Sequence, residues 1–187
     1  MSVTNMVSVI LKELAGNQQY LIDEQLRAAV DAVMQAKHIF TAGTGRSGVA
    51  VRAFTNRLMH LGYAVSSIGE ITTPHSGPGD LMIIASGSGE TQSLVSLSAK
   101  ARKGGVKILL FTMAPGSSIA KAADVVCVLP GVSPKLKDKG EKITSVQPMG
   151  SAFEQMAFLV FDAMILELME RTGQTSDDMY KRHADLE

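Results

Sequence analysis

The sequence predicts an α/β fold: a three-layer sandwich in which helices flank a five-stranded parallel sheet of order 2-1-3-4-5. Five short apolar runs divide the middle of the chain, and helix-length segments alternate with them. The runs hold few polar residues, as expected for parallel strands covered on both faces. At 187 residues the chain has the size of one domain, so we expect a single domain over residues 1–187.

Two helices are expected before the sheet, at Asn5–Leu14 and Asp23–Ala36. Apolar residues recur there at spacings of three and four, the pattern of an amphipathic helix. The five strands are expected at Ile39–Ala42, Ala64–Ile68, Leu81–Ala85, Val106–Phe111 and Val125–Leu129. The helices among them are expected at Arg46–Leu61, Thr91–Lys103 and Ser117–Ala123. This alternation of strands with helices favours parallel pairing.

The last part of the chain predicts a long polar connection and one apolar helix. Residues Gly131–Gly150 contain Lys135, Lys137, Lys139 and Lys142. This segment is either a solvated stretch or a lid that shields a substrate from water. The helix expected at Ser151–Arg171 is too apolar for one wet face, so we expect it to be buried within the subunit or against another. A polar tail, Gln174–Glu187, follows.

Composition excludes several classes of protein. The 18 basic and 18 acidic side chains balance, which argues against a nucleic-acid partner. The longest apolar stretch is too short to span a bilayer, and no secretory leader is apparent, so no membrane partner is expected. The lone cysteine, Cys127, cannot form an intramolecular disulfide. We therefore expect a cytoplasmic protein.

A glycine-rich loop follows the first strand and leads directly into a helix. Its sequence is Gly43-Thr44-Gly45-Arg46-Ser47-Gly48. Glycines permit a close backbone approach, and the free amides of a helix N-terminus attract an anion, so the loop predicts a phosphate cradle. The loop also matches the dinucleotide fingerprint G-x-G-x-x-G, with Glu70 as the acidic residue. Alternatively, the glycines only connect strand to helix, with Ser47 as the N-cap.

A second loop, Ser86-Gly87-Ser88-Gly89-Glu90-Thr91, follows the third strand and again precedes a helix. Its three hydroxyls can add side-chain donors to the backbone amides around one phosphate. In a sheet of order 2-1-3-4-5, strands one and three flank the point where the winding reverses, so both loops face one crevice. The alternative is that Ser88 and Glu90 only cap the helix.

These residues resemble the sugar isomerase (SIS) fold family, and within it the 6-phospho-3-hexuloisomerases. The resemblance covers essentially the whole chain. Besides the two loops, it is carried by Pro78-Gly79-Asp80-Leu81, Arg57-Leu58-Met59-His60, Gln147-Pro148-Met149-Gly150-Ser151, Phe153-Glu154-Gln155 and His183-Ala184-Asp185-Leu186-Glu187.

The resemblance implies an isomerase that interconverts D-arabino-hex-3-ulose 6-phosphate and D-fructose 6-phosphate, in the ribulose monophosphate pathway of formaldehyde fixation. A base must move a proton between C2 and C3 through an enediol, and the reaction requires no metal or redox cofactor. The substrate-binding residues are expected to be Gly45, Arg46, Ser47, Ser86, Ser88 and Thr91. The partner is thus a phosphosugar, and we expect a homo-oligomer, a tetramer rather than a dimer.

Glu154 is the expected base, because the family places a catalytic glutamate at the matching position. The alternative is a capping box, Ser151-Ala152-Phe153-Glu154, in which Glu154 only bonds the backbone of Ser151. His60 and His183 are the expected acids at O2 or O3, or agents of ring opening, and either could serve a neighbouring subunit. A surface or structural role is the alternative for both histidines, and ion pairing with another side chain is the alternative for Arg46.

Three other functions compete with this one. A sugar-phosphate-binding regulatory module would need the two loops but no base. Another phosphosugar aldose-ketose isomerase would use the same groups at different carbons. A nucleotide-dependent oxidoreductase would use Gly43, Gly45, Gly48 and Glu70, but the chain lacks room for the usual substrate domain.

Overall fold

The computed structural model describes residues 2–136 and 143–186. Five parallel strands form one sheet in the order β2-β1-β3-β4-β5, which confirms the predicted fold class. The strands are β1 (Ile39–Gly43), β2 (Val65–Ser67), β3 (Leu81–Ala85), β4 (Lys107–Thr112) and β5 (Val125–Val128). Each lies within two residues of its predicted bounds.

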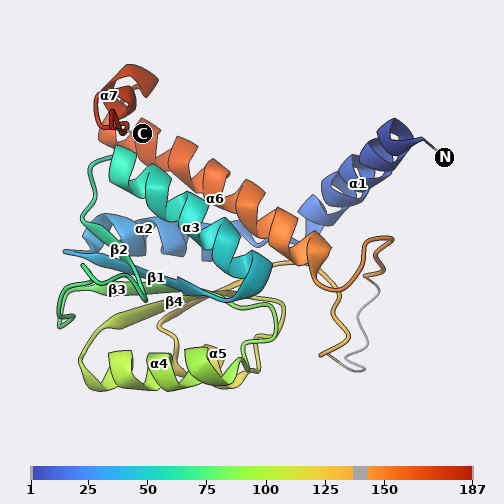
Figure 1. Ribbon diagram of the computed structural model, residues 1–187. Helices are drawn as coiled ribbons and strands as arrows, with labels where there is room; N and C mark the ends of the chain where they lie inside the picture. Colours follow the sequence, from blue (N-terminus) through green and yellow to red (C-terminus); the bar gives the residue numbers. More distant parts are fainter. Residues whose placement is uncertain (1, 137–142, 187) are drawn as a thin grey trace.

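Helices cover both faces of the sheet (Figure 1). One face carries α2 (Asp23–Gln35), α3 (Gly45–His60) and α6 (Ser151–Thr172), and the other carries α4 (Gln92–Lys103) and α5 (Ser118–Ala122). The N-terminal helix α1 (Val3–Asn17) projects from the end of α6 where that helix begins. A short 3-10 turn, η1 (Gln18–Tyr20), joins α1 to α2.

Strand side chains alternate between two separate apolar cores. In β3, Leu81, Ile83 and Ala85 join the core beneath α2, α3 and α6, whereas Met82 and Ile84 join the core against α4 and α5. All five residues are buried. The strands can therefore be apolar at successive positions, because helices remove both faces from water.

The α6 helix is the centre of the larger core, where Phe161 stacks on Phe54 of α3 with ring centroids 4.7 Å apart. Phe161 also meets Phe111 of β4 edge to face at 4.9 Å. On its other side, α6 leaves Phe158, Leu159 and Leu166 exposed. One apolar face of α6 is thus buried within the chain, and a second remains at the surface.

The lone cysteine lies in this larger core. Cys127 is fully buried on β5, and its Sγ donates a hydrogen bond to the Gln25 carbonyl oxygen (3.2 Å). Burial raises the pKa of the Cys127 thiol to about 12, because the thiolate would be poorly solvated there.

The polar tail forms a further helix, α7 (Ser176–Tyr180), that the sequence analysis did not identify. Thr175 Oγ1 accepts from the Asp178 backbone N–H (3.2 Å), and the Thr175 N–H donates to Asp178 Oδ2 (3.1 Å). This capping box holds the single helical turn in place. None of the helices in the described part of the chain could cross a membrane, being too short or too polar.

Candidate active site

The first glycine loop brings β1 and α3 into backbone contact. A Cβ on Gly43 would lie 2.9 Å from the Gly48 Cα, and one on Gly48 would lie 2.8 Å from the Gly43 carbonyl oxygen. Only glycine fits at both positions without a backbone shift. The α3 helix begins at Gly45, with Thr44 as N-cap, so the alternative of Ser47 as N-cap is wrong. No acidic residue occupies the first turn, which leaves the positive end of the helix dipole for an anion.

The second loop is held by hydrogen bonds from its backbone to its own serine side chains. The Gly89 N–H donates to Ser86 Oγ (3.2 Å), and the Glu90 N–H donates to Ser88 Oγ (3.3 Å). Gly89 has a φ of +61°, and a Cβ there would lie 2.0 Å from Ser117 Oγ. Thr91 is the N-cap of α4, but its side chain makes no capping hydrogen bond. The Thr91 hydroxyl can therefore serve a ligand.

The Glu90 side chain binds the start of α5, not the start of α4, and so connects the loop to α5. The Ser118 backbone N–H donates to Glu90 Oε1 (2.7 Å). This bond satisfies an amide at the start of α5 and keeps a negative charge out of the first turn of α4. The alternative that Glu90 only caps α4 is therefore wrong, because its carboxylate caps the next helix instead.

The strand register places the two loops side by side. Gly43 at the end of β1 is the Cα partner of Ala85 at the end of β3. The chain leaves β1 for the β2 side and β3 for the β4 side, so this is the point where the winding of the sheet reverses. A ligand between the loops meets the N-termini of α3 and α4 together.

A cavity of about 450 Å³ lies between these loops. Its lining includes every predicted substrate-binding residue, Gly45, Arg46, Ser47, Ser86, Ser88 and Thr91, together with Glu154. Its size suits a sugar phosphate. Glu70, the acidic residue of the dinucleotide pattern, is exposed beyond β2, outside the described lining of this cavity.

Glu154 reaches the cavity from the first turn of α6. Its carboxylate Oε2 accepts from Arg46 Nε, an ion pair that joins α6 to the start of α3. The Glu154 side chain is 18% exposed and that of Arg46 is 63% exposed. The capping-box alternative is wrong: Gly150 is the N-cap of α6, with no side-chain cap, and the Ser151 N–H donates to the Pro148 carbonyl.

His60 and His183 lie together at the opposite end of α3. Their rings stack with centroids 5.2 Å apart, and Arg57 Nη1 is 3.3 Å from His60 Nδ1. Arg182 Nη1 also donates to the His60 carbonyl (2.9 Å), which joins the segment after α7 to the end of α3. The 1.5 Å rise per residue puts His60 roughly 22 Å along the helix axis from Gly45. Within one chain, the histidines therefore do not meet Glu154.

A cavity of about 500 Å³ surrounds this histidine pair. It is lined by side chains of α3, α6 and the tail, among them Asp162 and Tyr180. The tail places the Tyr180 ring 5.9 Å from the His183 ring. The structure thus forms two polar sites, one at each end of α3.

Some cavity residues escaped the sequence analysis. Met113, Met149 and Phe153 line it, and so does the stretch 133–135 after β5. The polarity of residues 131–150 was the available signal, but polarity alone does not indicate which residues line the cavity. Of the four lysines considered for a lid, Lys135 lines the cavity, while Lys137, Lys139 and Lys142 lie outside the described residues.

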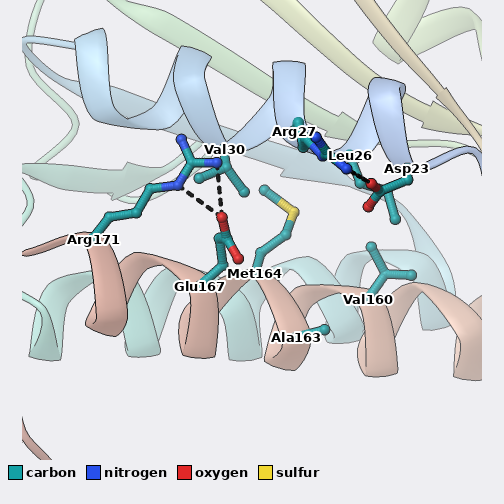
Figure 2. Close-up of a pocket in the computed structure, with 9 residues that line it drawn as sticks. All are labelled: Asp23, Leu26, Arg27, Val30, Val160, Ala163, Met164, Glu167 and Arg171. Carbon is teal, nitrogen blue, oxygen red and sulfur yellow. Dashed lines mark hydrogen bonds and ion pairs between the residues drawn. The ribbon is translucent and has the colours of Figure 1, made fainter.

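A groove of about 440 Å³ between α2 and α6 is built differently (Figure 2). Its floor is apolar, with Leu26, Val30 and Met164 among its residues. Its rim is charged, but those charges bind one another. Arg171 pairs with Glu167 (2.7 Å) and with Asp31 (2.6 Å), and Arg27 pairs with Asp23. The hydrogen bonds to Glu167 and Asp31 raise the pKa of Arg171. The pair with Asp31 joins α6 to α2.

In residues 2–136 and 143–186, no three or more histidine, cysteine, aspartate or glutamate side chains are grouped so that they could hold a metal ion.

The fold and the paired loops agree with a match to a protein-family model. Residues 32–159 match the SIS domain. The chain therefore belongs to the SIS domain family.

Two similar proteins are named for one particular isomerase activity. The chain is 45% identical over 187 residues to the 3-hexulose-6-phosphate isomerase of Bacillus subtilis (strain 168), with 100% of both chains covered. It is 37% identical over 185 residues to the 3-hexulose-6-phosphate isomerase of Mycobacterium gastri, covering 99% of this chain and 92% of that one.

A similar solved structure is associated with the same activity. A hypothetical protein of Methanococcus jannaschii, whose crystal structure infers a molecular function of 3-hexulose-6-phosphate isomerase, is 33% identical. The TM-score is 0.79, with 96% of this chain and 94% of that chain covered.

Proposed function

We propose that the protein is an isomerase that interconverts D-arabino-hex-3-ulose 6-phosphate and D-fructose 6-phosphate through an enediol. The observation that carries the proposal is the cavity in which two anion-binding loops meet the carboxylate of Glu154. A full-length relative at 45% identity that is named as this isomerase supports the substrate.

The phosphate of the substrate binds between the two loops. The N-termini of α3 and α4 supply backbone amides and the positive ends of two helix dipoles. The hydroxyls of Ser47, Ser86, Ser88 and Thr91 add donors, and Gly45 lets the backbone approach the anion closely. A terminal phosphate held here points the sugar carbons toward Glu154.

Glu154 is the base of the reaction. Starting from the 3-ulose, its carboxylate takes the proton from C2, the C2–H electrons form the C2–C3 double bond, and O3 gains a proton. The enediol then loses the O2 proton as the C2 carbonyl forms, and Glu154 returns a proton to C3. Partial shielding from water favours such a transfer. Arg46 beside it donates to the sugar oxygens, where charge develops.

His60 and His183 supply the acid at O2 or O3, or assist ring opening. Because both lie at the far end of α3 from Glu154, they serve the cavity of a neighbouring subunit. The protein is accordingly a homo-oligomer, and we propose a tetramer rather than a dimer. Exposed apolar side chains on α1 and α6, such as Leu11, Leu159 and Leu166, support such association.

We also propose where the protein acts and with which partner. The protein acts as a single SIS domain over residues 1–187, in the cytoplasm, in formaldehyde fixation by the ribulose monophosphate pathway. Its partner is a small phosphosugar, with no nucleic acid or membrane involved. The balanced charge and the anion-binding loops support this choice of partner.

Hydrogen exchange into fructose 6-phosphate in deuterated water tests the function. The proposal predicts deuterium at C3 of fructose 6-phosphate and at C2 of the 3-ulose formed from it. Deuterium at C1 would indicate an aldose-forming isomerase instead. Binding without any exchange would overturn the enzymatic function and support a sugar-phosphate-binding regulatory module.

A further inference from the structure

Glu13 lies on α1, outside the cavity, and binds the segment that leads into α6. Its carboxylate accepts from Ser145 Oγ (2.6 Å) and Gln147 Nε2 (3.3 Å) at Oε1, and from the Val146 backbone N–H (3.0 Å) at Oε2. Both oxygens are engaged, and hydrogen bonds to an ionised acceptor are among the strongest in proteins. One side chain thus connects parts of the chain more than 130 residues apart.

The bound segment continues directly to the cavity. The Gln147 N–H donates to Ser145 Oγ (3.0 Å), and the Gln147 side chain is buried. Met149 and Gly150 then line the cavity. In Figure 1 this stretch leads into the first turn of α6 and lies beside the C-terminal end of α1.

Met149 has a backbone conformation that needs support from its surroundings. Its φ is +56°, in the left-handed region that a side chain with a Cβ rarely adopts. Such a conformation persists only where neighbouring contacts impose it. Here the Glu13 bonds hold the chain before Met149, and the start of α6 holds the chain after it.

We propose that Glu13 is a positioning residue, which holds residues 145–150 as a wall of the substrate cavity and so sets the affinity for the sugar phosphate without touching it. The proposal rests on the proposed function. The wall joins α6 at Gly150, whose carbonyl accepts from the Glu154 N–H (3.0 Å), but Phe153 and Met156 anchor that helix in the core without the help of Glu13. Loss of the Glu13 carboxylate therefore moves the wall and leaves Glu154 in place.

The test compares Glu13→Gln with Lys12→Gln, an exposed neighbour on the same helix. Glutamine keeps the shape of the side chain but removes its charge. Its amide NH2 also replaces one acceptor oxygen with a donor that faces other donors. For Glu13→Gln, we expect KM for the 3-ulose phosphate and Kd for fructose 6-phosphate to rise about tenfold, as for the loss of a charged hydrogen bond. We expect kcat to stay within about twofold of wild type. Lys12→Gln should match wild type in all three.

Ser145→Ala removes a partner of Glu13 without altering α1. It should raise KM in the same direction by a smaller factor, and combining it with Glu13→Gln should add less than the sum of the two. Amide hydrogen exchange at Val146 and Gly150 should quicken in Glu13→Gln while Ile83 in β3 is unchanged.

Unchanged KM and Kd, a loss confined to kcat, or strictly additive effects would each overturn the positioning role. The Kd and amide-exchange measurements need no turnover, so they decide the role of Glu13 even if the wild-type protein shows no isomerase activity. An active wild type with an unaffected Glu13→Gln variant would overturn this inference alone.

Discussion

Glu154 and Arg46 form a charged pair whose partners differ in their contact with water. The carboxylate side chain is mostly covered, whereas the guanidinium is mostly exposed. An arginine at the rim can follow a substrate oxygen, and the carboxylate stays at the edge of the cavity. The pair joins positions 108 residues apart, which local sequence pattern could not reveal. Both residues are among those predicted from the sequence, whereas the contact between them is not.

Glu154→Gln should reduce kcat by about 10²- to 10⁴-fold, because the amide cannot accept the C2 proton. The ion pair is partly solvated, so unfolding free energy should change by less than about 1 kcal/mol. Kinetics, urea denaturation and calorimetric titration with fructose 6-phosphate measure these effects. Glu170→Gln, at an exposed position of the same helix, is the control. A Glu154→Gln variant that keeps most of its turnover would defeat the base assignment.

Removal of the Ser88 and Thr91 hydroxyls tests the phosphate cradle. Each alanine variant should weaken fructose 6-phosphate binding by about 1–2 kcal/mol, because it removes a hydrogen bond to a charged group. Ser93→Ala, exposed in the first turn of the same helix, should bind as wild type does. If the double variant Ser88→Ala/Thr91→Ala bound the ligand normally, the phosphate would have to lie elsewhere.

At the scale of elements, the sheet was predictable because its strands are buried on both faces. Successive apolar residues in Leu81–Ala85 can only belong to a covered strand or helix, and flanking turn residues make the run too short for a helix. The helix α7 was missed because its five residues are too few for a periodic pattern. Its capping box, Thr175 with Asp178, was the available signal.

The crossing of β1 and α3 depends on Gly43 and Gly48 touching backbone to backbone. Gly48→Ala places a Cβ against the Gly43 carbonyl, so one element must shift, and we expect a loss of about 1–3 kcal/mol in unfolding free energy. Val49→Ala alters an exposed neighbour and should cost less than about 0.5 kcal/mol. Urea denaturation compares the two. Equal stabilities would show that the contact is easily relaxed.

At the scale of the whole molecule, the two polar sites at opposite ends of α3 are the feature that sequence motifs could not resolve. The motifs for His60 and Glu154 belong to one family pattern, yet one chain keeps them apart. The predicted helix Arg46–Leu61 already places His60 far from the first glycine loop, but only the structure shows that Glu154 lies beside the start of that helix. If each subunit supplies its histidines to the cavity of a neighbouring subunit, His60 and Glu154 would lie in one site.

Mixed oligomers test this sharing. Glu154→Gln and His183→Ala chains, each expected to be nearly inactive, are expressed together with different tags. If each site takes its glutamate and its histidine from different chains, random assortment restores about a quarter of the sites. Activity of the doubly tagged species measures the recovery. His183 is exposed, so its replacement should not impair folding. Activity no greater than the sum of the separate variants would contradict a shared site.

The buried thiol of Cys127 has a practical consequence. Because it is the single cysteine of the chain, has no exposed surface and is held in its protonated form, maleimide or a disulfide reagent should not modify the native protein. One equivalent should react after denaturation in urea. The rate of labelling under native conditions therefore reports how often the molecule opens as far as β5, with no introduced probe. Rapid modification of the folded protein would show that this edge of the sheet opens on its own.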